Sequence, residues 1–299
     1  MNTSETYEQR LSDLTHGAAL LYVRTLSNLS SKRTMISTLR VLSRIEPRVL
    51  DGTLDYASAV KLRSTLVERY APSTANRMLS AVRGVLKTAQ SMGIRHDYER
   101  MASALYAVKA FKLPRGRAIE QDEIAALVKA CDDSAAGVRD RAIIGLLYSG
   151  LRRSEVASLR REAIQDGRVT VYGKGRRERV VYLPRGVWQA LQAWLDIRDR
   201  QLPLEGRVFA RIRHDGQLIG YFSSQSIYNV LSKRAMQADV WHITPHDLRR
   251  TFVTRLLERN VDTFIVAKLV GHADPRTTAI YDRRAEQEAK KAVALLDFP

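Results

Sequence analysis

The sequence lacks the features of a disulfide-linked or membrane-spanning protein. It has one cysteine, Cys131, so an intramolecular disulfide framework is excluded. No segment approaches the run of about 20 apolar residues that a helix needs to cross a bilayer. The polar, acid-containing start MNTSETYEQR lacks the basic end and apolar stretch of a signal peptide. We therefore expect a cytoplasmic protein that has no membrane partner.

Acidic residues are also scarce, and their shortage points to a polyanionic partner. The chain has 32 Asp and Glu against 49 Lys and Arg, a formal net charge of +17, and a pI near 10.2. The positive charge is spread through both halves of the chain. A membrane surface also attracts such a chain, but no amphipathic segment carries the Trp, Phe and Leu face needed for interfacial insertion. The composition therefore favours nucleic acid.

The length and the apolar pattern predict two domains. The chain has 299 residues, of which 45% are hydrophobic, enough for more than one core. Residues 1–111 show helical periodicity with little strand signal, whereas residues 119–299 combine helices with a predicted hairpin. Residues 112–118, which contain a proline, a glycine and basic side chains, are the expected linker. We predict an all-α N-terminal domain and a mainly α catalytic domain with a small β-hairpin sheet and a C-terminal tail helix. The expected N-terminal helices are 15–26, 31–45, 56–70, 74–92 and 98–110.

Two of the N-terminal helices carry basic faces opposite their apolar faces. Such a face is most often solvated surface, but in a basic chain it is also a candidate contact for DNA phosphates. Gly84 interrupts one of these helices, and either close approach of a phosphate or tight helix packing would explain it. The candidate DNA-binding residues are Arg33, Arg40, Arg44, Arg77, Arg83 and Lys87.

A hairpin is predicted at residues 168–183. Segments 168–172 and 179–183 are rich in β-branched residues and flank the turn GKG, which contains Lys174. A nucleotide-binding loop is not favoured, because the glycine spacing of a Walker motif is missing and no helix follows. Taken alone, Lys174 is an ordinary solvated turn lysine.

The segment Thr244 to Arg284 has polar residues where a helix should be apolar. Thr244, Pro245 and Asp247 predict a capped helix start, and the helix should continue to about residue 259. At about 100° per residue, Arg249 falls inside the apolar stripe and His246 lies on it. Arg250 and Thr254 take the other side of this helix. A guanidinium in a core stripe needs an anionic partner, either a structural carboxylate or a bound ligand.

The following segments add a histidine and a tyrosine. A short helix is predicted at residues 263–270, and Gly271 ends it, so His272 emerges at a helix end. Another short helix should start near Pro275 and carry Tyr281, which is either a packing residue or a functional one. A zinc site is not favoured, because the chain has no HExxH motif and one cysteine.

Together these motifs resemble the tyrosine recombinase, or phage integrase, family. The segment HDLR, the dipeptide GH and the following tyrosine match its C-terminal signature. GLRRSE at residues 150–155 and YGKGRRER at residues 172–179 match its upstream motifs in the same order. The resemblance implies the catalytic residues Arg152, Lys174, His246, Arg249, His272 and Tyr281, with Glu155 in support.

The resemblance also implies the function. A protein of the Xer-like or mobile-element integrase branch would recombine double-stranded DNA at a specific site through a 3′-phosphotyrosine intermediate and a Holliday junction. It would act as a homotetramer on DNA and as a monomer or dimer when free, without metal or cofactor, with an accessory or partner recombinase in some systems. The alternatives are a type IB topoisomerase and a non-catalytic DNA-binding accessory protein. The target site, the biological role and cleavage in cis or in trans stay open.

Overall fold

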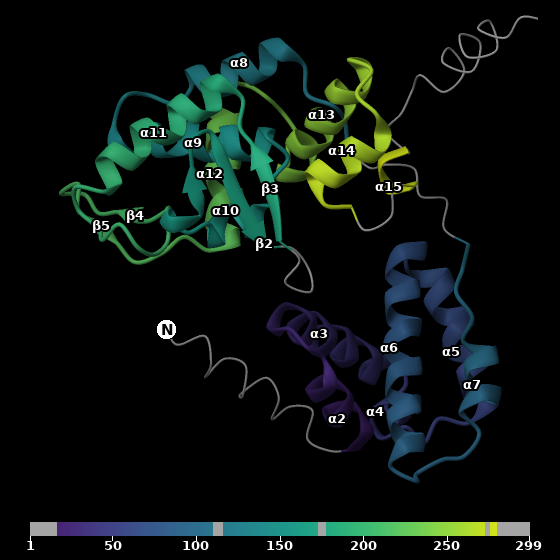
Figure 1. Ribbon diagram of the computed structural model, residues 1–299. Helices are drawn as coiled ribbons and strands as arrows, with labels where there is room; N and C mark the ends of the chain where they lie inside the picture. The colour runs from purple at the N-terminus through teal and green to yellow at the C-terminus, as the bar shows by residue number, and fades with distance from the viewer. Residues whose placement is uncertain (1–16, 110–115, 173–177, 273–275, 280–299) are drawn as a thin grey trace, which may run out of the picture. The chain divides into compact units, whose positions relative to one another are not determined.

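The computed structural model describes residues 17–109, 116–172, 178–272 and 276–279 (Figure 1). The chain divides into two compact units, Met1–Leu113 and Pro114–Pro299. This division falls inside the predicted linker, but residues 112–115 lie outside the described residues, so the linker and the domain limits stay predictions. Gly116 is the first described residue after this gap. Its carbonyl accepts a hydrogen bond of 2.5 Å from Arg250 Nη1 in the second unit.

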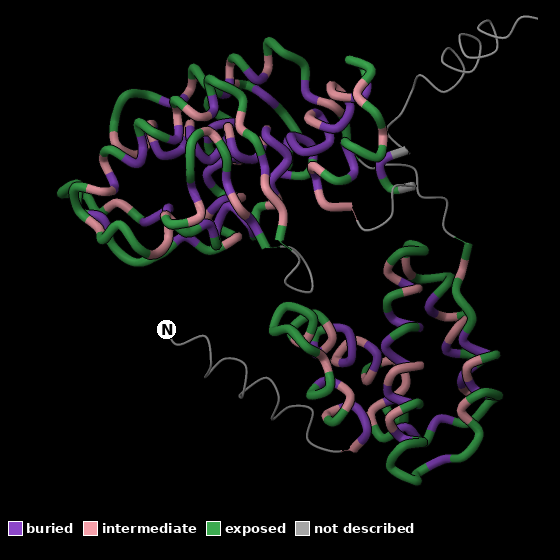
Figure 2. Tube along the Cα trace, viewed as in Figure 1, coloured by how far each residue is buried: buried purple, intermediate pink, exposed green. Residues whose placement is uncertain are grey.

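The described residues of the first unit form helices joined by loops, and its buried residues, purple in Figure 2, form one hydrophobic core. The predicted helices are confirmed, with ends shifted by a few residues. The last helix ends earlier than predicted, because backbone groups beyond it bind side chains of α6 (Pro72–Ser91). The Leu105 carbonyl accepts a hydrogen bond from Arg83, and the backbone N–H and carbonyl of Val108 both bind the Asn76 side chain. The elements are α2 (Gly17–Thr25), α3 (Leu29–Ile45), α4 (Arg48–Asp51), α5 (Tyr56–Arg69), α6 (Pro72–Ser91) and α7 (Tyr98–Ala104).

Close helix packing accounts for the glycine in the middle of α6. A Cβ atom added to Gly84 would lie 2.3 Å from Cζ of Tyr22 on α2, which is far inside van der Waals contact. Burial of this tyrosine against α6 also raises its pKa. Of the two explanations for Gly84, helix packing is therefore the one that the structure supports.

The second unit combines helices with two small antiparallel sheets (Figure 1). This arrangement confirms the predicted fold class. Its helices are α8 (Gln121–Lys129), α9 (Ala135–Tyr148), α10 (Arg153–Ser158), α11 (Arg185–Arg198), α12 (Ser224–Gln237), α13 (Pro245–Glu258), α14 (Thr263–Val270) and α15 (Arg276–Ala279), with a 3-10 turn at Arg161–Ala163. Its strands are β1 (Ile164–Gln165), β2 (Arg168–Tyr172), β3 (Glu178–Tyr182), β4 (Arg211–Ile212) and β5 (Leu218–Ile219).

The predicted hairpin is confirmed as β2 and β3, and β1 adds a third strand in the order β1-β2-β3. The register pairs Thr170 with Val180 and Val171 with Arg179. The inward side chains of β2 and β3 join a core formed by α8 to α12, with Trp194 of α11 as its largest fully buried member. The short β1 was not predicted because two residues are too few to show alternation. None of the described helices is long and apolar enough to cross a bilayer.

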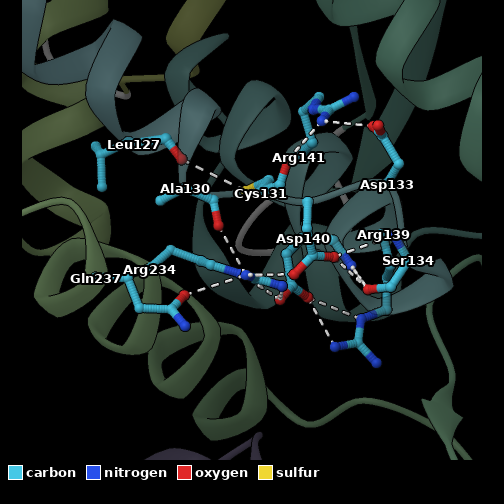
Figure 3. A network of polar contacts seen from close by, with 12 residues as sticks. Leu127, Ala130, Cys131, Asp133, Ser134, Arg139, Asp140, Arg141, Arg234 and Gln237 are labelled. Atoms are coloured by element: carbon cyan, nitrogen blue, oxygen red, sulfur yellow. Dashed lines mark hydrogen bonds and ion pairs between the residues drawn. The ribbon is translucent and has the colours of Figure 1, made fainter.

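A buried ion network fixes α9, the helix that leads into the GLRRSE motif (Figure 3). Asp140 on α9 is 2% exposed and accepts hydrogen bonds from its neighbour Arg139 and from Arg234 of α12, at 2.7 to 3.0 Å. Arg234 also donates to the carbonyl of Ala130 at the end of α8. Asp140 and Arg234 together therefore join α8, α9 and α12.

Replacing Asp140 with Asn should lower the free energy of unfolding of the second unit by about 3 kcal/mol, because two buried guanidinium groups lose their anion. Urea denaturation measures this loss. The control is Asp133→Asn, since the Asp133 side chain is 98% exposed and its ion pair with Arg141 is long at 3.4 Å. An equal effect of the two substitutions would contradict the structural role of the Asp140 network.

Candidate active site

Helix α13 begins as predicted and places His246 and Arg249 on one face. Asp247 accepts hydrogen bonds from the backbone N–H and hydroxyl of Thr244, and the Thr244 hydroxyl accepts one from the Asp247 N–H, which forms a capping box. Pro245 occupies the first helical turn. His246 and Arg249 are three residues apart, so they lie one above the other on the helix surface.

The opposite face of α13 is buried as well, which its apolar stripe does not predict. Arg250 and Thr254 are nearly inaccessible. Residues 116–121 run along this face, where the Ile119 N–H donates to the Thr251 hydroxyl at 2.7 Å and Arg255 donates to the Ile119 carbonyl. The segment that enters the second unit therefore packs directly on the helix that carries His246 and Arg249.

Arg249 is held inside the unit by backbone carbonyl groups. Arg249 is 3% exposed, and its terminal nitrogens donate to the carbonyls of Gly150 and Val270, each at 2.6 Å. These two bonds join α13 to the loop before α10 and to the end of α14. The guanidinium is thus fixed in place before any ligand arrives.

Arg152 is oriented by a carboxylate and by one backbone carbonyl. Its backbone N–H and its Nη1 donate to Glu155, at 2.7 and 2.9 Å, and its Nη2 donates to the carbonyl of Gly271 at 2.9 Å. The Arg152 side chain is still 40% exposed, whereas the Glu155 side chain is 4% exposed. Arg152 is therefore anchored on one side and open to a ligand on the other.

Arg179 of β3 belongs to the same cluster and was not predicted from the sequence. Its two terminal nitrogens bind the two oxygens of Glu155 at 2.7 and 2.8 Å, and its Nε donates to the carbonyl of Leu269 at 3.1 Å. Burial acts to raise the pKa of Glu155, but the hydrogen bonds from Arg179 and Arg152 outweigh it and lower that pKa. The sequence did contain one signal. Arg179 and the buried Val181 are two residues apart on β3, so their side chains lie on the same, inward face of the strand, where an arginine is unusual.

The C-terminal end of α14 is where these arginines meet. Three consecutive carbonyls, those of Leu269, Val270 and Gly271, accept hydrogen bonds from arginines of β3, α13 and the loop before α10. The end of a helix carries partial negative charge, which favours guanidinium groups there. Gly271 ends the helix in the left-handed conformation with φ of 68°, and an added Cβ would lie 3.0 Å from Cδ of Arg179.

His272 follows directly and is bound to the next short helix. Its Nδ1 lies 2.8 Å from the hydroxyl of the buried Thr278 on α15. Burial, together with the positive charges of Arg249 and Arg152, lowers the pKa of His272 to about 4. Burial and the charges of Arg249 and Arg250 also lower the pKa of His246. Both imidazoles are therefore neutral near pH 7 in the DNA-free protein.

The low pKa of His272 predicts a pH dependence of stability. Unfolding returns this pKa from about 4 to its ordinary 6.5, so between these values the unfolded chain binds a proton that the folded chain does not. Stability should therefore fall as the pH drops through this window. Urea denaturation at about pH 7 and about pH 4.5 measures the fall, and His272→Gln should reduce it.

The control for this experiment is His214→Gln, which changes an exposed turn histidine and should leave the wild-type loss of stability unchanged. His246 contributes to the slope with the same sign, so the His272 variant should flatten the dependence without removing it. A wild-type pH dependence in His272→Gln would contradict the burial of a neutral imidazole at this position.

The structure brings four of the predicted site residues, Arg152, Glu155, Arg249 and His272, together around the end of α14. His246 lies one turn from Arg249 on α13, where the charges of Arg249 and Arg152 act on it. The predicted Lys174 and Tyr281 lie outside the described residues. Tyr281 comes two residues after the end of α15 in the sequence. Within the described ranges, no group of three or more His, Cys, Asp or Glu side chains is placed to hold a metal ion.

The predicted DNA-binding residues lie on α3 and α6 of the first unit and stay predictions. Arg33, Arg44, Arg77 and Lys87 are exposed, and Arg40 is half-buried. Arg83 is also half-buried, and its Nη1 donates to the carbonyl of Leu105 at 2.7 Å. Arg83 therefore has a structural contact in addition to any role on DNA.

Comparison with known proteins shows the class to which this fold and this site belong. Residues 117–288 match the model of the phage integrase family. The chain belongs to this family, the tyrosine recombinases, which confirms the resemblance seen in the sequence.

The curated relatives include tyrosine recombinase XerC of Pseudomonas aeruginosa PAO1, which is 37% identical over 215 residues. The match covers 69% of this chain and 66% of that relative. XerC of Pseudomonas syringae pv. syringae B728a is 36% identical over 211 residues, which cover 69% of this chain and 67% of the relative.

Solved structures share the fold at low sequence identity. The XerH site-specific recombinase bound to palindromic difH substrate has a TM-score of 0.67 and 18% identity, covering 88% of this chain and 80% of that one. A lambda integrase dimer bound to a COC′ core site has a TM-score of 0.65 and 15% identity, covering 93% and 95% of the two chains.

Proposed function

We propose that this protein is a site-specific DNA recombinase that cuts and rejoins DNA strands through a 3′-phosphotyrosine intermediate. The observation that carries the proposal is that Arg152, Arg249 and His272 meet at the end of α14, with His246 near enough that burial and the charges of Arg249 and Arg152 lower its pKa. Two guanidinium groups anchored by backbone carbonyls can bind the non-bridging oxygens of a phosphodiester. They also stabilise the negative charge of its pentacoordinate transition state.

The nucleophile in this proposal is Tyr281. Its oxygen attacks the phosphorus, a tyrosine O–P bond forms, and the bond from phosphorus to the 5′ oxygen breaks. A tyrosine with an ordinary pKa near 10 is only about 0.1% ionised at pH 7, a penalty of roughly 4 kcal/mol. His246 is the proposed base that accepts the phenolic proton, and its lowered pKa leaves its imidazole neutral for that role.

The leaving group and the phosphate need two more residues. An alkoxide is a poor leaving group, so Lys174 is the proposed acid that protonates the 5′ oxygen. His272 is the proposed donor of a hydrogen bond to the phosphate through Nε2, since its Nδ1 is bound to Thr278. The phosphotyrosine retains the energy of the broken bond, so a 5′ hydroxyl from another duplex can reverse the step without metal or ATP.

Double-stranded DNA with a specific recombination site is the proposed partner. The relatives XerH and lambda integrase were solved bound to difH substrate and to a core site, which supports this choice. We further propose that a homotetramer exchanges the strands through a Holliday junction. An accessory or partner recombinase is part of this proposal. A cytoplasmic location is proposed on the same basis, because the substrate is DNA.

A gel assay separates this function from a type IB topoisomerase and from an accessory protein. The target site is first found by sequencing the DNA ends that the protein traps. Two labelled duplexes that carry this site are then incubated with the protein in EDTA. A recombinase should join the label of one duplex to the other, a topoisomerase should relax supercoiled DNA without exchange, and an accessory protein should do neither. Absence of recombinant strands would contradict the proposal.

The basic face of α6 should contribute to the salt dependence of DNA binding. If Arg77 contacts a phosphate, Arg77→Ala should reduce the slope of log affinity against log salt by about 0.9. Arg77→Lys is the matched control, since it keeps the charge and should keep the slope. Fluorescence anisotropy over a range of salt concentrations measures both variants. Equal slopes for wild type and Arg77→Ala would show that this face is ordinary solvated surface.

A further inference from the structure

The network around α14 contains one arginine for which the proposed chemistry has no role. The hydrogen bonds of Arg179 run to Glu155 and to the carbonyl of Leu269. Its side chain is 10% exposed, and each of its three guanidinium nitrogens donates to protein, Nη1 and Nη2 to the oxygens of Glu155 and Nε to the carbonyl of Leu269. The charge of Arg179 is already paired with the Glu155 carboxylate, so its action on a phosphate passes through the groups that it binds.

Glu155 is the group that Arg179 controls most directly. This carboxylate receives four hydrogen bonds, two from Arg179 and two from Arg152. The two-point contact of a planar guanidinium fixes the carboxylate plane. With its plane fixed, Glu155 can hold the backbone and the Nη1 of Arg152 at the same time, which leaves the exposed part of that side chain in one orientation.

The second contact of Arg179 reaches the other support of Arg152. Its Nε binds the Leu269 carbonyl, and two residues later the Gly271 carbonyl accepts the Nη2 of Arg152. The stem of Arg179 also packs where any Cβ on Gly271 would stand. Arg179 therefore contacts both structures that orient Arg152, the Glu155 carboxylate and the α14 terminus.

We propose that Arg179 is a positioning residue for DNA cleavage, which holds Glu155 and the end of α14 in the arrangement that aligns Arg152 with the scissile phosphate. The proposal rests on the proposed recombinase function. Arg179 lies on β3, five residues after Lys174, so a loss of activity could also come through the hairpin lysine. The experiment must therefore separate an effect on phosphate binding in the transition state from an effect on protonation of the leaving group.

The test compares single-turnover cleavage of a nicked duplex by wild type, Arg179→Met, Glu155→Gln and the double variant, all at saturating DNA. Arg179→Met should lower the cleavage rate by about 10- to 100-fold, by analogy with the loss seen when a residue that orients a metal ligand is replaced. DNA affinity should change less than twofold. The double variant should be no slower than the slower single variant, because both substitutions remove the same support of Arg152.

A substrate with sulfur in place of the bridging 5′ oxygen distinguishes an effect on phosphate binding from an effect on protonation of the leaving group. A thiolate leaves without protonation, so this substrate restores a variant that lacks the general acid. It should not restore Arg179→Met. Arg168→Met, which changes an exposed arginine on the adjacent strand β2, is the matched control and should cleave at the wild-type rate.

Arg179→Lys keeps the charge but cannot bind both carboxylate oxygens, so it should cleave at an intermediate rate. If Arg179→Met does not fold, the rate of Arg179→Lys decides the test. A wild-type rate for Arg179→Lys and Arg179→Met, multiplicative losses in the double variant, or rescue by the sulfur substrate would each overturn the proposal. If the wild type itself forms no covalent adduct, the recombinase function is what fails.

Discussion

Replacing Tyr281 with Phe should abolish DNA cleavage and leave duplex binding unchanged. The substitution keeps the ring and removes the hydroxyl group that the proposed mechanism uses as the nucleophile. No other group can then form the covalent link to the 3′ phosphate, so the expected loss is complete within the detection limit of a gel. The assay is adduct formation on a nicked duplex from which the 5′ fragment diffuses away, with DNA affinity measured in parallel.

The control for this substitution is Tyr182→Phe, which removes the hydroxyl group of an exposed tyrosine on β3. This variant should form the adduct at the wild-type rate. If Tyr281 were only a packing residue of its helix, Tyr281→Phe would behave like Tyr182→Phe. An adduct formed by Tyr281→Phe at more than a trace level would therefore refute the assignment of the nucleophile.

Replacing Arg152 with Lys should lower the cleavage rate by about 100- to 1,000-fold, the range found when one preorganised donor to a developing oxyanion is removed. The arginine uses separate nitrogens for Glu155 and for the Gly271 carbonyl and still has an exposed side. A lysine ammonium group keeps the charge but cannot reproduce this planar arrangement. Single-turnover cleavage at saturating DNA isolates the chemical step from binding.

Arg153→Lys is the matched control for this experiment, because Arg153 is the next residue and is exposed. It should cleave like the wild type, and its free energy of unfolding should stay within about 0.5 kcal/mol of the wild-type value, as expected for a surface substitution. A rate for Arg152→Lys within threefold of the control would contradict a role for this guanidinium in the transition state.

Local signals were enough to predict most helices and the hairpin. The capping pattern of Thr244 and Asp247 and the glycine after Val270 marked the limits of α13 and α14. Arg249 was noticed because a guanidinium stood in an apolar stripe, and the structure places it in a buried network. These features could be predicted because each depends on residues within a few positions of one another.

Features that depend on distant residues were not predicted. Glu155 and Arg179 are 24 positions apart, and Arg179 and Leu269 are 90 apart, so no periodicity connects them. The burial of Arg250 depends on the segment at Gly116, 134 positions earlier. Gly84 was flagged by its cost in a helix, but only the position of Tyr22 could decide between packing and a phosphate. Tertiary contacts of this kind must be seen in the structure.

Mapping the protein–DNA adduct by mass spectrometry shows whether Tyr281 is the nucleophile. The wild type is trapped on a nicked duplex in EDTA, the DNA is digested to a short stub, and the protein is cleaved with trypsin. We expect the added nucleotide mass on the peptide TTAIYDR, residues 277–283, whose single tyrosine is Tyr281. An adduct on any other peptide, or no adduct until a divalent metal is supplied, would contradict this expectation.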